Sequence, residues 1–105
     1  MSKFGMVRVA GSSMAPTYDN GDWLLVLWMQ QSTHRGQLGS IAVIEREEHP
    51  GIFLIKRIQN SHGGKYWVEG DNIESSDSRA WGWITPNEIV GRVLFRVRKG
   101  RSINA

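Results

Sequence analysis

Cysteine is absent from the 105 residues, which excludes disulfide-stapled scaffolds and thiolate metal sites. Long apolar runs are also lacking, because the longest one, WLLVLWM at 23–29, is far shorter than the ~20 residues that a membrane-spanning helix needs. The N-terminal stretch MSKFGMVRVAG has no extended apolar core of the kind that a secretory signal carries. We therefore expect a soluble, cytoplasmic protein that has no transmembrane segment and is not exported.

Histidine is scarce, and its three copies stand singly beside proline or glycine or in polar stretches, at His34, His49 and His62. None of them lies near GSSMAPT at 11–17. This segment has a serine pair followed by an apolar residue and, after one further residue, a proline, a pattern that suggests a function beyond that of a surface loop. If Ser13 in this segment is a nucleophile, a side chain other than a nearby histidine must accept its proton. We expect neither a metal site nor a cofactor.

Charge of one sign is only slightly in excess, with a formal net charge of +3. Most of the excess lies in RVLFRVRKGR at 92–101, where Val93, Phe95 and Val97 alternate with other residues as in a strand with one buried face. Arginines on the other face of such a strand discourage edge-to-edge pairing. Because no base-stacking motif accompanies these charges, we expect a solvated edge strand and no nucleic-acid partner.

The chain consists of short apolar segments separated by turn residues, with no amphipathic helix of useful length. The segment 23–29 is apolar at every position, which predicts a strand buried on both faces, and NSHGG at 60–64 predicts a hairpin turn. We expect one mostly β domain of short antiparallel strands, with its core at about 7–98 and a flexible tail at 99–105. The predicted strands cover residues 6–11, 23–29, 41–47, 52–59, 65–71 and 89–98.

A lysine can replace histidine as the base only when it is neutral, and its ordinary pKa of about 10.4 prevents this near pH 7. Burial among apolar side chains disfavours the ammonium form and lowers the pKa. In the predicted strand GIFLIKRIQ, Lys56 shares a face with Leu54 and Ile58, so two aliphatic residues flank it. From alternation alone, Lys56 could equally extend its amine into solvent from an edge strand.

Three segments together resemble the signal peptidase I-type serine–lysine proteases. GSSMAP is similar to the Ser-Met-x-Pro nucleophile motif, and LIKRI to the lysine motif. GDNIESSDSRAWGWITP, at 70–86, resembles the Gly-Asp-Asn … Asp-Ser-Arg … Gly box of that family. The resemblance runs from about Val9 to Arg92 and implies a signal-peptidase-like catalytic domain. Self-cleaving repressors of the LexA and UmuD type share the first two elements, but the third box and the lack of a DNA-binding helical domain disfavour that interpretation.

The resemblance implies a serine endopeptidase in which Ser13 is the nucleophile and Lys56 the general base. The Ser13 N–H would donate to the oxyanion, whereas many bacterial members add a serine hydroxyl at the position that Gly11 occupies here. Met14 and Pro16 belong to the same oxyanion and substrate loop. Proline stiffens that loop through its fixed φ, while Met14 either lines a shallow substrate pocket or fills the core.

The third box also implies supporting residues. Asp71 is positioned to pair with Arg57, and Asp77 with Arg79, so that the irregular segment is held against the lysine strand; ordinary surface ion pairs remain the alternative.

The family orients its lysine with a serine of this box, and here the box is one residue shorter between Asn72 and Asp77. Counting from its start gives Ser76, and counting from its end gives Ser75. The alignment of the Asp-Ser-Arg element at the end of the box favours Ser75.

Small size and the VEGDN segment make the chain similar to the nickel-type superoxide dismutase maturation proteases, which remove a leader from a precursor. The expected partner is thus a leader-bearing precursor, with nickel superoxide dismutase suspected. One alternative is a leader peptidase that acts on secretory or membrane-delivered precursors, with transient membrane contact but no stable insertion. A second is a non-catalytic peptide-binding module on the same fold. The segment 23–29 favours core packing over contact with substrate or lipid.

Overall fold

Short apolar segments build six β-strands in the computed structural model, which describes residues 3–29 and 37–100. Residues 30–36, between two of the expected strands, and the last five residues of the expected tail lie outside the described residues. A short helix and a 3-10 turn occupy the irregular segment before the last strand. The elements in chain order are β1 (Lys3–Arg8), β2 (Trp23–Trp28), β3 (Ile41–Glu45), β4 (Phe53–His62), β5 (Lys65–Glu69), α1 (Ser78–Trp81), η1 (Pro86–Glu88) and β6 (Ile89–Arg98).

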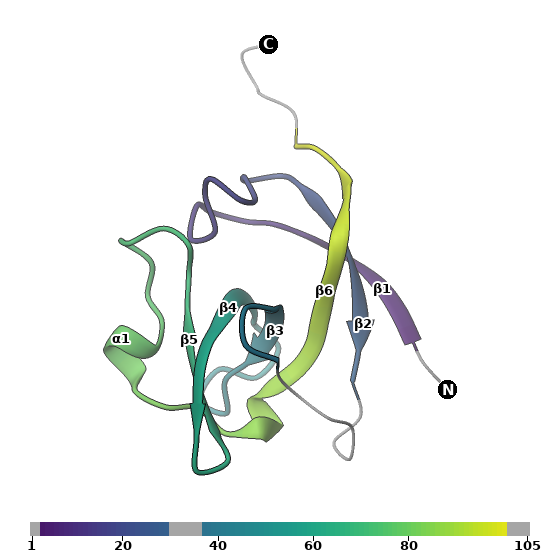
Figure 1. Ribbon diagram of the computed structural model, residues 1–105. Helices are drawn as coiled ribbons and strands as arrows, with labels where there is room; N and C mark the ends of the chain where they lie inside the picture. Colours follow the sequence, from purple (N-terminus) through teal and green to yellow (C-terminus); the bar gives the residue numbers. More distant parts are fainter. Residues whose placement is uncertain (1–2, 30–36, 101–105) are drawn as a thin grey trace.

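The six strands form one antiparallel sheet in the order β1-β2-β6-β3-β4-β5. The sheet bends so that β1, β2 and β6 form one half and β3, β4 and β5 the other, with α1 beside β5 (Figure 1). The radius of gyration is 13.4 Å, close to the value of about 13 Å for a compact domain of this size. The prediction of a single, mostly β domain is therefore confirmed. In residues 3–29 and 37–100, no helix has the length and apolar character needed to cross a membrane.

Strand β3 divides the core in two because it is buried on both faces. Val43 points into a cluster with residues of β2 and β6, whereas Ala42 and Ile44 point the other way. Lys56 pairs with Ala42 across β3 and β4 and is buried beside the second of these clusters. The first cluster contains Val9, Leu24, Val26, Val43 and Val93, and the second contains Ala42, Ile44, Ile58, Val68, Ile84 and Ile89.

The last strand departs from the expected edge strand. β6 lies between β2 and β3, and only beyond Arg92 does it lose its β3 neighbour. Val93 is buried, but Phe95 and Val97 are 55% and 50% exposed. The prediction of one continuous buried face is therefore wrong for the second half of the strand, because β3 is too short to accompany it.

The expectation that segment 23–29 is buried on both faces is also wrong. Leu24 and Val26 are fully buried, but Trp23 on the other face is 36% exposed. That other face continues across the strands through Met6, Leu25 and Phe95, which are register partners. We call this surface of β1, β2 and β6 the outer face. It stays partly exposed because no described element packs over it.

Candidate active site

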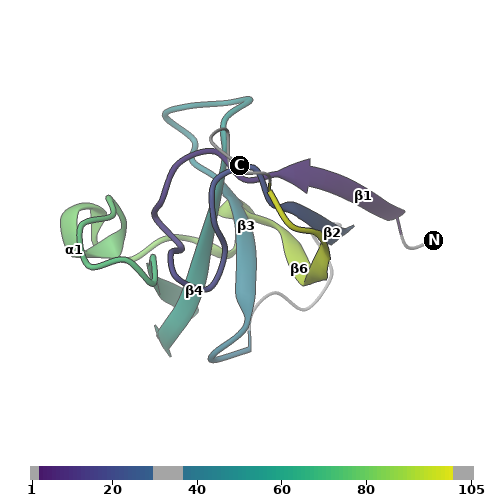
Figure 2. The same ribbon diagram turned by 90° about the horizontal axis from the view of Figure 1, so that it is seen from above.

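Ser13 lies in a loop between β1 and β2 whose two ends are joined by hydrogen bonds. The Val9 N–H donates to the Asp22 carbonyl, and the Gly21 N–H donates to the Val9 carbonyl, at 2.8 and 2.7 Å. Within the loop, Met14 is 1% exposed and anchors it from beneath. Figure 2 shows this dark purple loop passing beside β4. Burial of Met14 and closure at the base hold Ser13 in a defined position.

Asn72 of the third box fastens the serine loop from the other side. Its backbone N–H donates to the Ser13 carbonyl at 2.9 Å, and its side-chain amide donates to the Ser12 carbonyl at 3.0 Å. Gly70 lies against the same carbonyl of Ser13, and a Cβ at this position would overlap both that oxygen and Ser75. The third box therefore fixes the backbone of the serine loop directly.

Lys56 is held inside the protein by β4. Alternation along this strand turns Lys56 and Ile58 inward, and Lys56 is only 3% exposed. Among the described residues it forms no ion pair. Burial lowers the pKa of Lys56, and the Arg79 guanidinium acts in the same direction while the Asp77 carboxylate opposes it. An amine in such surroundings loses its proton more readily than a solvated lysine.

Ser13 and Lys56 line one open pocket of about 460 Å³. Ser76 belongs to the same lining, as do several residues that follow β3 or stand in α1. A serine hydroxyl and a buried amine in one pocket are the two groups that proton transfer from a nucleophile to a base requires. The complete lining is Ser13, Arg46, His49, Ile52, Leu54, Lys56, Ser76 and Trp81.

Asp77 is a buried carboxylate that organises the third box. It accepts hydrogen bonds from the Gly70 N–H at 2.8 Å, from the Ser75 hydroxyl at 2.6 Å and from the Arg79 guanidinium at 2.6 Å. It also caps α1 by accepting from the Arg79 N–H. Burial alone would raise the pKa of Asp77, but the hydrogen bonds outweigh it and hold that pKa far below its ordinary value. Ser75 is therefore committed to this network, while Ser76 faces the pocket.

Arg57 and Asp71 form a bidentate ion pair with N···O distances of 2.9 and 2.8 Å. Arg57 also donates to the Gly39 carbonyl, and Asp71 accepts from the Thr17 hydroxyl of the serine loop. The hydrogen bond from Arg57 lowers the pKa of Asp71. The pair thus connects β4, the third box and the serine loop.

The remaining residues of the expected oxyanion and substrate loop differ in their positions. Gly11 has a φ of +89°, and its N–H is occupied by the Asn20 side chain at 2.8 Å. Met14 fills the interior and does not line the pocket, whereas Pro16 is exposed. In the described part of the chain, the Ser13 N–H has no acceptor.

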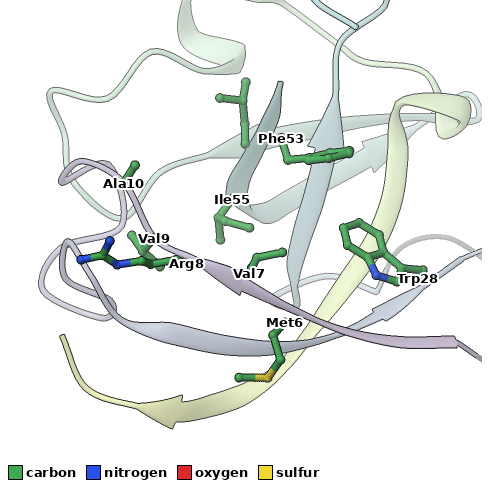
Figure 3. A pocket seen from close by; sticks show the side chains of 9 residues that line it. Met6, Val7, Arg8, Val9, Ala10, Trp28, Phe53 and Ile55 are labelled. Carbon is green, nitrogen blue, oxygen red and sulfur yellow. The ribbon is translucent and has the colours of Figure 1, made fainter. Parts of the chain in front are cut away.

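A second, largely apolar groove of about 460 Å³ lies between β1 and the start of β4. Figure 3 shows Val7, Val9 and Ile55 around it, with Met6 on the opposite side of β1. Leu54 lines both this groove and the pocket of Ser13, so the two adjoin at this residue. β1 has β2 as its only strand partner among the described residues, and its free edge is available for an added strand.

Sequence reasoning missed Trp81, Arg46 and Asn72. Both Trp81 and Arg46 line the pocket. Arg46 follows a strand end that neither periodicity nor a motif marks, whereas Trp81 stands inside the third box at a position to which the resemblance gave no role. Asn72 stood inside the resembling box, yet its hydrogen bonds to the serine loop depend on a contact between residues about 60 positions apart. In residues 3–29 and 37–100, no group of three or more His, Asp or Glu side chains is arranged to hold a metal ion.

Comparison with known proteins agrees with this arrangement. Mitochondrial inner membrane protease subunit 1 of Homo sapiens is 28% identical over 114 residues, covering 89% of this chain and 69% of that protein. The Xenopus tropicalis protein of the same name is 29% identical over 113 residues, covering 88% and 68%. Signal peptidase IB of Staphylococcus aureus (strain N315) is 46% identical over 54 residues, covering 44% of this chain and 28% of that protein. The sequence profile described as Peptidase S24-like matches residues 2–94, a range that includes the serine loop, β4 and the third box, and the chain therefore belongs to the Peptidase S24-like family.

Proposed function

We propose that the protein is a serine endopeptidase in which Ser13 and Lys56 form a catalytic dyad that removes an N-terminal leader from a protein precursor. The observation that carries this proposal is the presence, in one pocket, of a serine hydroxyl and a buried lysine that has no ion-pair partner among the described residues. Membership of the Peptidase S24-like family and the similarity to signal peptidase IB support it.

In this mechanism the neutral amine of Lys56 accepts the hydroxyl proton as the Ser13 oxygen attacks the scissile carbonyl carbon. The resulting ammonium returns the proton to the departing amine, and an ester between Ser13 and the leader remains. Lys56, again neutral, then takes a proton from water as the water oxygen attacks the ester carbonyl carbon. The ammonium returns this proton to the Ser13 oxygen as the ester bond breaks, and the leader leaves with a new carboxyl group. Each proton that Lys56 accepts is returned, so the enzyme emerges unchanged.

Two further groups serve this chemistry. The Ser13 N–H, which donates to no other described group, stabilises the developing oxyanion. Ser76, which lines the pocket, orients the amine of Lys56, while Ser75 stabilises the Asp77 network. Arg57, Asp71, Asp77 and Arg79 keep the third box against the serine loop and β4.

The groove between β1 and β4 is the proposed site for the extended chain of the precursor. An edge strand can pair with an added strand through its main chain, and neighbouring pockets then select side chains. The apolar lining of this groove favours small or apolar uncharged residues in the part of the substrate that it holds.

Matched substitutions test the dyad. Ser13→Ala and Lys56→Met are expected to abolish cleavage of a leader-bearing precursor. Mass analysis of the products measures this cleavage. Ser12→Ala, next to the nucleophile, and Lys65→Met, on the exposed hairpin, should retain cleavage. Full activity of Ser13→Ala with an intact fold would eliminate the mechanism. A parent protein that binds the precursor without cutting it would instead favour a non-catalytic peptide-binding module.

The proposed precursor is a leader-bearing nickel-type superoxide dismutase, on the basis of the resemblance in size and in the VEGDN segment. Incubation of the purified protein with that precursor is expected to release the leader and a single new N-terminus. If the protein cuts other leader-bearing substrates but leaves this precursor uncut, the substrate assignment is wrong and the dyad still stands.

A second candidate is a leader peptidase for membrane-delivered precursors. The outer face favours it, because Phe4, Met6 and Phe95 are 62%, 47% and 55% exposed on it, and because the relatives include mitochondrial inner membrane proteases. Sedimentation with phosphatidylcholine–phosphatidylglycerol vesicles would detect binding, which Phe95→Ser should weaken and Ile73→Ser, an exposed residue of the third box, should not. Complete recovery of the protein in the supernatant would rule this candidate out.

A further inference from the structure

Trp81 stands between two cationic side chains in the pocket of Ser13. Its ring centroid is 6.0 Å from the Lys56 amine and 4.5 Å from the Arg46 guanidinium carbon. All three residues line this pocket, although they come from α1, β4 and the turn after β3. The reaction described above requires Lys56 but assigns no role to Trp81 or Arg46.

Arg46 is fixed on the indole ring by its other contacts. Its Nε lies 2.9 Å from the buried carboxylate of Glu88, and its Nη2 donates to Glu48 at 2.8 Å. Glu88 is itself immobilised because it accepts hydrogen bonds from the Thr85 and Glu47 N–H groups. The Nε contact is an ion pair without hydrogen-bond geometry, Nη1 has no hydrogen-bond partner among the described residues, and both atoms are shielded from solvent. Two carboxylates thus hold the guanidinium at a distance from the indole ring that suits a cation–π contact.

We propose that Trp81 and Arg46 are positioning residues for the general base: the indole ring closes the space beside the Lys56 amine, and Arg46 holds the ring there and keeps its face occupied by a positive charge. This inference rests on the proposed function of Lys56.

Two physical effects of this arrangement favour the neutral amine. The ring excludes water that would solvate an ammonium group, and burial is the main cause of the lowered pKa of Lys56. A second cation on the ring also reduces the attraction that the ring could offer to an ammonium at Lys56. Other charged or titratable groups around Lys56 are Asp77, which favours the ammonium, and Arg79, which disfavours it, together with His49 and, through Arg46, Glu88 and Glu48.

The pH dependence of cleavage tests the proposal, because the acid limb of kcat/KM reports the loss of the Lys56 proton. Arg46→Met is expected to move this limb upward by about one pH unit, which lowers cleavage at neutral pH by up to about tenfold. Arg46→Lys, which keeps the charge, should stay near the wild-type profile. In Arg46→Met alone, the unpaired Glu88 carboxylate could itself raise the pKa of Lys56. The double variant Arg46→Met/Glu88→Gln removes this carboxylate and should keep the upward shift, which would then be due to loss of the guanidinium. Arg92→Met, at an exposed arginine of β6, is the matched control and should leave the profile unchanged.

The ring is tested in the same way. Trp81→Ala admits water beside Lys56 and is expected to move the acid limb upward, while Trp81→Phe should restore most of the wild-type profile. Trp83→Ala is the matched control, because Trp83 belongs to the same segment and packs on Trp67 but does not line the pocket. If Trp81→Ala has a lower melting temperature but an unshifted acid limb, Trp81 has only a structural role and the proposal is overturned.

A measurement without catalysis separates this inference from the proposed function. In Ser13→Ala protein, nitrogen NMR of the lysine side chains follows the titration of Lys56, with Lys65 as the internal reference. Arg46→Met and Trp81→Ala should each raise the pKa of Lys56 and leave Lys65 unchanged. If Lys56 titrates low and neither change moves it, the proposed function survives and the inference fails. If Lys56 titrates like Lys65 in the parent protein, the dyad itself fails.

Discussion

Gly70 is the position where a single methyl group is expected to disable the site. A Cβ at Gly70 would overlap the Ser13 carbonyl oxygen and the Ser75 side chain. Gly70 is not among the residues with positive φ, so the cost of Gly70→Ala is steric and not conformational. Ser75 could rotate away only by giving up its hydrogen bonds with Asp77 and Arg79. The Ser13 oxygen belongs to the backbone and has no such freedom.

The expected magnitude follows from the contacts that must open. Separation of the third box from the serine loop lengthens the two hydrogen bonds that Asn72 makes to Ser12 and Ser13. Two such bonds at about 1 kcal/mol each give a loss of roughly 2 kcal/mol in the free energy of unfolding. This loss lies within the range of about 1–3 kcal/mol for overpacked sites. For a domain of this size that corresponds to a fall of roughly 10 °C in melting temperature. A shift of the nucleophile by about 1 Å lowers kcat by about 100-fold.

Thermal unfolding and single-turnover cleavage of a leader-bearing precursor measure the two effects. Gly70→Ala/Ser75→Gly removes one of the two overlaps and should recover part of the stability but little activity, because the Ser13 oxygen still meets the new methyl group. Ile73→Ala, at a residue 83% exposed in the same loop, should match the parent protein. If Gly70→Ala melted and cleaved like the parent, the third box would not position the nucleophile.

Four other substitutions probe individual groups. Lys56→Met should raise the melting temperature at neutral pH, because it removes a buried amine that lowers stability there. Since the pKa of Lys56 is lowered on folding, the unfolded state binds more protons and the stability of the parent protein rises with pH. A variant whose melting temperature lies below that of the parent at every pH would contradict the burial argument. Asp71→Asn should cost about 1 kcal/mol near pH 7 in denaturant unfolding, since the partly exposed pair with Arg57 is lost. Because the pKa of Asp71 is lowered on folding, this difference should vanish as the pH falls through the folded-state pKa, below the ordinary 3.8, and a constant difference would refute it. Ser76→Ala should lower kcat about tenfold with little change in melting temperature, whereas Ser75→Ala should mainly lower the melting temperature; the reverse result would exchange their roles.

Local signals carried much of the fold. Alternation and glycine turns marked the strands and the Gly63–Gly64 hairpin because these depend on neighbours in the chain. The place of β6 in the sheet did not follow from such signals, since an alternating strand looks the same at an edge and in the interior. Its half-exposed end also depends on the length of β3, a segment almost 50 residues earlier.

For the candidate site, the sequence by itself determined which chemical groups are present: it singled out Ser13 and Lys56 and excluded thiolates, because residue types and short motifs are local properties. Alternation alone left open whether Lys56 faces inward, and the structure shows it buried. Only the tertiary structure decided which groups share a pocket, placing Ser76 and Trp81 in the pocket that Lys56 lines and committing Ser75 to Asp77. The physical reason is that desolvation and steric contact depend on atoms brought together from distant segments, and no local pattern encodes them.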